Sequence, residues 1–185
     1  MYMEKKKIYV LMLSEFFPKT HSRAGTPTGF KDKFTLGQSC PDCNETQDLS
    51  CEHISNCTGC MRTFLFPKLH TIRANYPLWG KRISDIQAGR AVLSVRQWQG
   101  KPYRSKQVEI ARLTVDNGIG IQKLQFYKDK DGVSSLRFFG IDGKYIDREI
   151  LANNDGLSKE DWQEWFRDYD LSKPMAVIHF TKFRY

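Results

Sequence analysis

The stretch Ala91-Val-Leu-Ser-Val-Arg-Gln-Trp98 opens a series of β-rich runs, and these runs decide the fold class of the chain. Turn signals such as Asp129-Lys-Asp-Gly132 and Asp142-Gly143 separate them. The other runs span residues 107–114, 121–127, 135–141 and 175–181. Because short strands recur with few helices between them, the pattern predicts a small β-barrel.

Helices occupy a smaller part of the prediction. Residues 7–13 are typical of one more strand and residues 30–36 of a short helix. A clearer helix begins after Ser158, an N-cap residue with Asp161 three positions on. Its apolar stripe consists of Trp162, Trp165, Phe166 and Tyr169. Such a stripe is more typical of a core-facing helix than of a ligand site. We therefore expect an α+β fold, a small barrel with a few flanking helices.

The composition limits the class of protein. The chain has 185 residues, of which 40% are hydrophobic and 13% aromatic, so it can bury a core as one domain over residues 1–185. No apolar run reaches the roughly 18 residues of a membrane span. A basic start at residues 5–7 precedes an apolar stretch, 8–13, that is too short for the core of a secretory signal. The sequence therefore predicts a cytoplasmic protein without membrane association.

The positive charge is concentrated in one segment. The chain carries 29 Lys and Arg against 21 Asp and Glu, a net charge of +8. Residues 61–106 contain ten of these cations and a single acid, Asp85. The aromatic residues interleaved with them are Tyr76, Trp79, Trp98 and Tyr103. Cations that neutralise phosphate beside rings that stack on bases favour a nucleic-acid partner. A solvated basic surface is the alternative interpretation.

The five cysteines form a cluster. Two CxxC pairs are separated by thirteen residues, which is a spacing typical of a tetrahedral zinc site with four thiolate ligands. Cys51 and His53 lie between the pairs, and either is able to replace one ligand. Disulfides, which a cytosolic chain disfavours, and a redox pair are the alternatives. Residues 38–66 are therefore predicted to be a loop held together by a structural Zn²⁺. Its expected ligands are Cys40, Cys43, Cys57 and Cys60.

The densest polar stretch is Lys68-Leu-His-Thr-Ile-Arg-Ala-Asn-Tyr76. A lysine whose pKa is depressed by burial acts as a base toward a nearby hydroxyl, which makes Lys68 and Thr71 candidates. In a strand these two side chains converge only if the chain turns between them. A surface lysine beside a strand threonine is the alternative. His70 and His179 are either hydrogen-bonded polar residues near a barrel mouth or groups in a pocket.

A second basic stretch, Gly100-Lys-Pro-Tyr-Arg-Ser-Lys-Gln107, combines phosphate-binding cations with one stacking ring. It is the best candidate for direct contact with a nucleic acid. No P-loop, no GxGxxG after a strand, no HExxH and no GxSxG is present in the sequence. These motifs therefore give no support to their enzyme classes.

Several motifs, taken in order, resemble the ASCH domain, a PUA-like β-barrel. The resemblance rests mainly on Lys68-x-x-Thr71-x-Arg73 and on the late helix and final strand, and it covers most of residues 28–181. The matching parts are Phe30, Phe34, Gly89, and the segments 92–95, 162–166 and 175–180. The cysteine loop is then an insertion before the signature. Residues 11–14 and 68–107 look like the corresponding parts of uncharacterised proteins from bacterial and phage or mobile-element genomes.

The resemblance implies two kinds of activity. PUA-like barrels commonly bind RNA or modified bases, and one small bacterial ASCH branch deacetylates acetylcytidine with a Lys, a Thr and a Glu. Lys68 and Thr71 match the first two positions. Where that branch has its Glu, this chain has Asn153-Asn154-Asp155-Gly156. Asp155 is therefore the candidate acid, and Glu109 is a second one.

We therefore expect recognition of a nucleotide or base within a nucleic acid. The predicted ligand-binding residues are Lys68, His70, Thr71, Arg73, Arg96, Lys101, Tyr103, Arg104 and Lys106. The alternative is an amidohydrolase acting on an N-acylated cytosine, with Lys68 as base, Thr71 as nucleophile or orienting group and Asp155 as proton partner. A third hypothesis is a protein-interaction adaptor built on the zinc loop.

Overall fold

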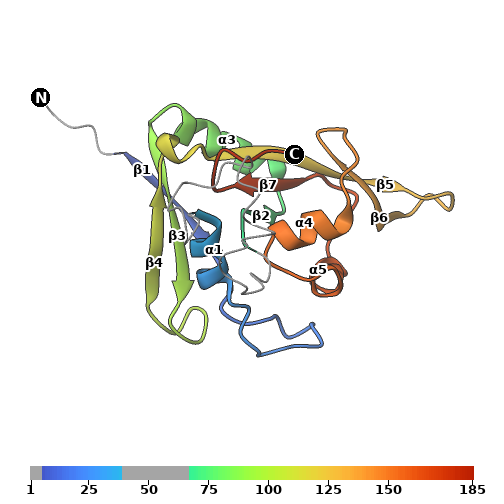
Figure 1. Ribbon diagram of the computed structural model, residues 1–185, viewed down its shortest axis with the longest axis horizontal. Coiled ribbons are helices and arrows are strands. Elements are labelled where there is room, and N and C mark those ends of the chain that lie inside the picture. The colour runs from blue at the N-terminus through green and yellow to red at the C-terminus, as the bar shows by residue number, and fades with distance from the viewer. Residues whose placement is uncertain (1–5, 39–66) are drawn as a thin grey trace, which may run out of the picture.

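The computed structural model describes residues 6–38 and 67–185 of the chain (Figure 1). The strands are β1 (Lys7–Met12), β2 (His70–Arg73), β3 (Ala91–Trp98), β4 (Gln107–Leu113), β5 (Gly120–Lys128), β6 (Ser134–Ile141) and β7 (Met175–His179). The helices are α1 (Phe30–Gln38), α3 (Tyr76–Gln87), α4 (Arg148–Asn154) and α5 (Lys159–Phe166), with a short 3-10 helix η1 (Val115–Asn117).

The strands form two sheets that share one hydrophobic core. One sheet has the order β1-β3-β4 and the other the order β2-β7-β5-β6. β1 and β3 run parallel, and every other pair of neighbours is antiparallel. In Figure 1 the three-stranded sheet lies at the left, α4 and α5 at the right, and α3 across the top. The result is a curled, largely antiparallel half-barrel with flanking helices.

This architecture confirms the predicted α+β class. The five β-rich runs correspond to β3 through β7, and the expected first strand and first helix are β1 and α1. The described strands stay in two sheets, so within residues 6–38 and 67–185 they form a half-barrel rather than a closed barrel. In the same ranges, no helix is both long enough and apolar enough to cross a membrane.

The sequence patterns did not predict two helices, α3 and α4. α3 contains Pro77 and Gly80, which are typical of turns. Pro77 is tolerated because it lies in the first turn, where its missing N–H has no helical partner. Asn75, in the left-handed conformation, accepts a hydrogen bond from the N–H of Leu78 and starts the helix. The buried residues of α3 are Trp79, Ile83 and Ile86.

Aromatic side chains anchor α5 to the sheet. The ring of Trp162 lies 5.1 Å from that of Phe166 and 5.9 Å from that of Phe139 on β6, measured between centroids. Trp162 and Phe166 are 0% and 2% exposed, which confirms that this stripe faces the core. Tyr169 follows the end of α5 and is 41% exposed. Each buried ring contributes about 1.5–3 kcal/mol of hydrophobic stabilisation.

α1 and the end of α4 together hold the chain that leads into β2. The N–H of Lys68 donates to the carbonyl of Lys33 at 2.9 Å, and the N–H of Leu69 donates to the carbonyl of Asn154 at 2.8 Å. Lys68 and Asp155 also form an isolated β-bridge. Residues 68 and 69 are therefore fixed between two helices before the strand begins.

Gly37→Ala tests the close approach of α1 to residue 68. A Cβ at position 37 would lie 2.6 Å from the backbone oxygen of Lys68, so one of the two backbones has to move. Overpacking of this kind costs about 1–3 kcal/mol, whereas alanine gains about 1 kcal/mol over glycine in a helix. We expect a lower free energy of unfolding, measured by urea denaturation.

Gly80→Ala is the matched control, because Gly80 also lies inside a helix and a Cβ there meets no atom within 4 Å. This substitution should raise the free energy of unfolding by about 0.5–1 kcal/mol. The same stabilisation in both variants would contradict the described packing of α1 against residue 68.

Candidate functional site

A buried ion pair between Lys68 and Asp155 forms the centre of the site. The Nζ of Lys68 lies 2.5 Å from Oδ1 of Asp155 and 2.5 Å from its backbone oxygen, and it donates to both. Lys68 is 1% exposed and Asp155 is 3% exposed. The ring of Phe30, from the start of α1, covers the ammonium group at 4.0 Å from its centroid. The two sequence-predicted residues are therefore in direct contact.

Burial moves the two pKa values of the pair toward each other. Desolvation lowers the pKa of Lys68 to about 8, although the nearby carboxylate of Asp155 opposes this change. Desolvation likewise raises the pKa of Asp155, against the effect of three neighbouring cations. Lys68 therefore loses its proton at a lower pH than an exposed lysine does.

Two further cations lie close enough to act on Asp155, and neither has a carboxylate in a described salt bridge. Lys33 of α1 donates from Nζ to the backbone oxygen of Gly156 at 2.8 Å. Arg73, at the end of β2, donates from Nη2 to the backbone oxygen of Met12 at 2.5 Å. Burial lowers the pKa of both side chains. Asp155 acts electrostatically on both cations, and Asp161, which pairs with Arg23, also acts on Lys33, so Asp155 is the one buried carboxylate beside Lys33, Lys68 and Arg73.

Histidines of two paired strands lie beside this cluster. His70 of β2 and His179 of β7 are Cα partners, and their rings are 5.6 Å apart. His70 Nε2 shares a hydrogen bond of 2.7 Å with the hydroxyl of Tyr185, and its Nδ1 lies 4.0 Å from Oδ1 of Asp155. Burial lowers the pKa of His70 well below its usual value and that of His179 to about 3. Both imidazoles are therefore neutral at physiological pH.

Thr71 follows on the same strand and is 2% exposed. It is the Cα partner of Ile178 on β7. Within the described part of the chain its hydroxyl makes no hydrogen bond with Lys68 or with any other residue. The structure therefore brings Lys68 and Asp155 together and leaves the Thr71 hydroxyl without a described hydrogen bond.

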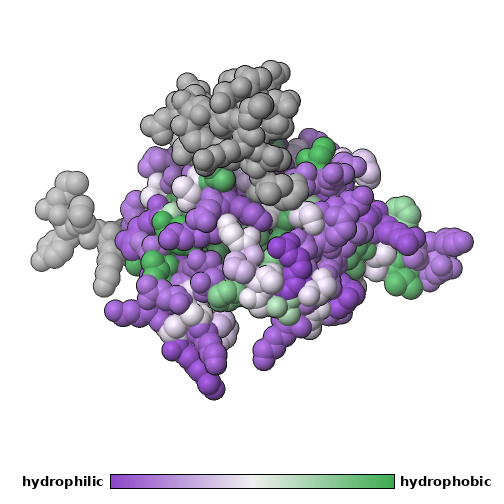
Figure 2. Space-filling model, turned by 60° about the horizontal axis from the view of Figure 1, so that its bottom comes forward, coloured by the Kyte–Doolittle hydropathy of each residue, from purple (hydrophilic) through white to green (hydrophobic). Residues whose placement is uncertain are grey.

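The predicted basic loop lies at the end of β3 and is exposed. Lys101, Arg104 and Lys106 are exposed, and Tyr103 is 89% exposed with its ring 5.4 Å from that of Trp98. Arg96 lies between this loop and the buried site. It is the Cα partner of Met12 on β1, and the carbonyl of Met12 accepts a hydrogen bond from Arg73. Figure 2 shows the face that carries this end of the molecule, and hydrophilic residues cover most of it.

The cations of residues 61–106 do not all lie at this end. Arg90 precedes β3 and pairs with Asp85 at 2.6 Å, whereas the basic loop follows the same strand. The eight residues of β3 separate the two places by about 26 Å at roughly 3.3 Å per residue. Figure 1 shows α3 and the β3–β4 loop at opposite ends of the three-stranded sheet. The charge excess of this segment is therefore divided.

Glu109, the second candidate acid, belongs to a different cluster. It lies on β4, where its carboxylate accepts hydrogen bonds from the hydroxyl of Ser94 and from Arg112 at 3.1 Å. Its other ion-pair partner is Arg96, at 3.7 Å. These hydrogen bonds lower the pKa of Glu109. The acid next to Lys68 is Asp155, and Glu109 instead holds Arg96 in place.

The predicted zinc ligands Cys40, Cys43, Cys57 and Cys60 lie outside the described residues, as do Cys51 and His53. In the ranges 6–38 and 67–185, no three His, Cys, Asp or Glu side chains are grouped so that they could hold a metal ion. The zinc site stays a prediction.

Sequence reasoning missed Lys33, Asn154 and Tyr185 as members of the site. Tyr185 reaches His70 from the last position of the chain, and Asn154 Nδ2 donates to its hydroxyl at 3.1 Å. None of the three lies in a motif. Only the spacing of Phe30 and Lys33 on one helix gives a local signal, since residues three apart share a face.

Comparisons with known proteins leave the family open. The chain matches no family model, and searches among curated proteins and among solved structures found no match. The resemblance to the ASCH domain therefore depends on the sequence motifs alone, and the chemistry of the site has to follow from its side chains.

Substitution of the buried pair tests its energetic role. Lys68→Met or Asp155→Leu alone leaves one buried group without its partner, and we expect each to lower the free energy of unfolding by roughly 3–5 kcal/mol. The double variant removes both charges and should recover most of this loss. Urea denaturation of the four proteins measures the coupling. A double variant as unstable as the sum of the single ones would contradict direct pairing.

Proposed function

We propose that this protein recognises a nucleotide within a nucleic acid, with RNA preferred over DNA. The observation that carries the proposal is the excess of positive charge at the buried site. Lys33 and Arg73 donate only to backbone oxygens in the described structure, and Lys68 has the single carboxylate of Asp155. A partly buried, uncompensated positive charge is costly without a ligand and favours an anion such as a phosphate group.

The route from this site to the surface supports a polymer rather than a free anion. Arg73 reaches the backbone of Met12, and Met12 pairs with Arg96 at the end of β3. The exposed cations of the 99–106 loop follow directly, together with Tyr103. Cations that bind successive phosphates, with one ring for stacking, suit a single strand.

Neutral polar groups in the site provide a means of reading a base. His70 and His179 are neutral because burial lowers their pKa, and His179 has no described hydrogen-bond partner at either ring nitrogen. The hydroxyl of Thr71 is also without a described partner. Base edges are recognised by such donors and acceptors, whereas phosphate contacts only position the strand.

These features fit an ASCH-type, PUA-like barrel in the cytoplasm. In this proposal residues 38–66 are an insertion that a structural Zn²⁺ holds together through Cys40, Cys43, Cys57 and Cys60. Four thiolates leave no position for a substrate water, so the metal stabilises the loop and takes no part in recognition.

Binding of fluorescent single-stranded RNA, measured by anisotropy at several salt concentrations, tests the proposal. The logarithm of the affinity should fall with the logarithm of the salt concentration, by about 0.7 per phosphate contact. Replacing Lys101, Arg104 and Lys106 by Gln should lower this slope by up to about 2. Arg73→Gln should weaken binding at least tenfold, and Arg73→Lys should weaken it less because the charge remains.

The matched control replaces three exposed lysines away from the site, Lys128, Lys130 and Lys144, by Gln. It changes the net charge by the same amount and should leave the slope nearly unchanged. Thermal melting checks that each variant is folded. Equal loss in the control and the loop variant would indicate attraction by net charge alone and would contradict a defined site.

The second candidate function is hydrolysis of an N-acylated cytosine. The observation that favours it is the contact of Lys68 with Asp155, because the buried lysine has a pKa of about 8. A base works best when its pKa lies near the operating pH. Thr71, three positions on, has a hydroxyl without a described hydrogen bond.

A balanced reaction uses these three groups. The neutral amine of Lys68 takes the proton of the Thr71 hydroxyl while the Thr71 oxygen bonds to the acyl carbon. The bond between the acyl carbon and the nitrogen of the cytosine then breaks as Lys68 returns that proton to the leaving nitrogen. Water then attacks the acyl group on Thr71 and gives one proton to Lys68. Lys68 passes this proton to the Thr71 oxygen as the acyl group leaves as a carboxylic acid. Asp155 stabilises the ammonium form of Lys68 in both steps.

Release of cytidine from N4-acetylcytidine, followed by chromatography, tests this second function. Lys68→Met and Thr71→Val should each lower turnover at least a hundredfold, while Lys130→Gln should not change it. Turnover should rise with pH through about 8, since only the neutral amine of Lys68 accepts a proton. Unchanged acetylcytidine after prolonged incubation with equimolar protein would rule this function out and leave the binding proposal standing.

A further inference from the structure

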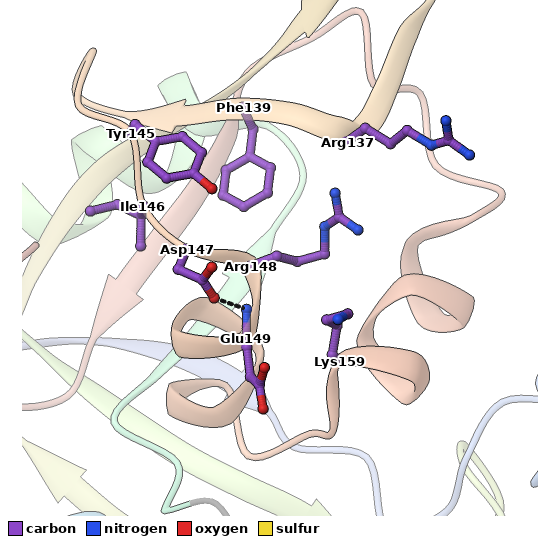
Figure 3. Close-up of a pocket in the computed structure, with 8 residues that line it drawn as sticks. All are labelled: Arg137, Phe139, Tyr145, Ile146, Asp147, Arg148, Glu149 and Lys159. Atoms are coloured by element: carbon purple, nitrogen blue, oxygen red, sulfur yellow. Dashed lines mark hydrogen bonds between the residues drawn. The ribbon is translucent and has the colours of Figure 1, made fainter.

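A cavity of about 220 Å³ lies on the other side of α4, away from the site described above (Figure 3). Its walls come from β6, from the segment that leads into α4, and from the first residues of α4 and α5. None of the residues predicted from the sequence as site residues lines it. The cavity is therefore a separate feature of the fold.

Three cations from three different elements line this cavity: Arg137 of β6, Arg148 of α4 and Lys159 of α5. None of the three side chains has a hydrogen bond or an ion pair in the described structure, and Nε of Arg148 is buried without a partner. Figure 3 shows the side chain of Arg148 between those of Arg137 and Lys159. Like charges repel when no acid pairs with them, and none of these three cations forms an ion pair in the described structure, so this arrangement is suited to an anionic ligand.

The two carboxylates at the cavity do not neutralise these cations. Asp147 is the N-cap of α4, and its Oδ1 accepts from the N–H groups of Glu149 and Ile150 at 2.7 and 3.4 Å. The carboxylate of Glu149 is directed away from the guanidinium groups of Arg137 and Arg148 in Figure 3. Neither acid forms an ion pair with a described residue, and the guanidinium groups stay available to a ligand.

The size of the cavity and its donors select the ligand. About 220 Å³ is less than the roughly 300–1,000 Å³ of a pocket for a drug-sized molecule, so the cavity fits a small charged group. A phosphomonoester has a charge of about −1.5 to −2 and three acceptor oxygens. Two guanidinium forks and one ammonium group provide one cationic donor group for each of the three oxygens.

Tyr145 extends the site beyond the charged group. It lines the rim of the cavity beside Phe139 and is 79% exposed, so one face of its ring is open to a flat partner. We propose that this cavity binds a nucleoside monophosphate, with the phosphate on Arg137, Arg148 and Lys159 and the base stacked on Tyr145. The proposal shares no residue with the site of the proposed function and does not depend on it.

Isothermal titration calorimetry of the full chain with three probes tests the proposal: inorganic phosphate, cytidine 5′-monophosphate and cytidine. We expect the monophosphate to bind more tightly than inorganic phosphate, and cytidine not to bind measurably. Arg148→Gln and Arg137→Gln should each weaken monophosphate binding at least tenfold. Tyr145→Ala should weaken it several-fold while leaving the weaker affinity for inorganic phosphate unchanged.

Lys130→Gln is the charge-matched control, because Lys130 is exposed in the turn between β5 and β6. It should bind the monophosphate as the wild type does, and thermal melting shows whether each variant is folded. Affinities within twofold of the wild type in both arginine variants would overturn the site. Binding of O-phosphoserine as tightly as the monophosphate would overturn the assignment to a nucleotide and indicate a phosphopeptide.

Discussion

The buried contact between Lys68 and Asp155 is the interaction on which the rest of the structure depends. It joins residues 87 positions apart and fixes the entry to β2 against the end of α4. Phe30 covers it and the backbone of α1 accepts the N–H of Lys68, so α1 is fixed to the same point. A buried ion pair often adds no more to the free energy of unfolding than apolar residues of similar volume would, because both charges lose their hydration. Ionisable groups with shifted pKa values cluster at functional sites, which makes this pair the centre of the candidate site.

Local patterns in the sequence were sufficient to predict most of the strands and helices. They also identified some residues of the site, such as Lys68 and Asp155, but not Lys33 or Tyr185. Turn signals and β-rich runs located β3 through β7, although only β5 alternates regularly between buried and less buried residues, whereas β7 is buried throughout. They did not reveal α3, in which Pro77 and Gly80 are typical of a turn but occupy tolerated helical positions. Lys68 and Asp155 were each selected by motif, but their contact depends on long-range packing. Lys33 reaches the site only because α1 packs there, and the spacing of Phe30 and Lys33 shows a shared helix face but not what that face packs against.

The distribution of charge also depends on long-range packing that the sequence does not show. The count over residues 61–106 was correct, but β3 places Arg90 and the basic loop at opposite ends of one strand. What distinguishes the cations in space is the acceptor that each one finds. Arg90 and Arg96 pair with carboxylates, whereas Lys33 and Arg73 donate only to backbone oxygens in the described structure. Uncompensated cations mark candidate ligand sites more sharply than the net charge of a segment does.

α4 has a consequence of its own, because its two ends belong to the two candidate ligand sites. Arg148 is its first residue and Asp155 is its C-cap, and seven helical residues span about 10 Å at roughly 1.5 Å per residue. A short helix moves as a rigid rod, so a shift at one end displaces the other. If a ligand at the first turn alters the position of Asp155, then by thermodynamic linkage a ligand at Asp155 alters affinity at the first turn by the same factor. Under the two proposals, α4 is the element through which the two binding equilibria would be coupled.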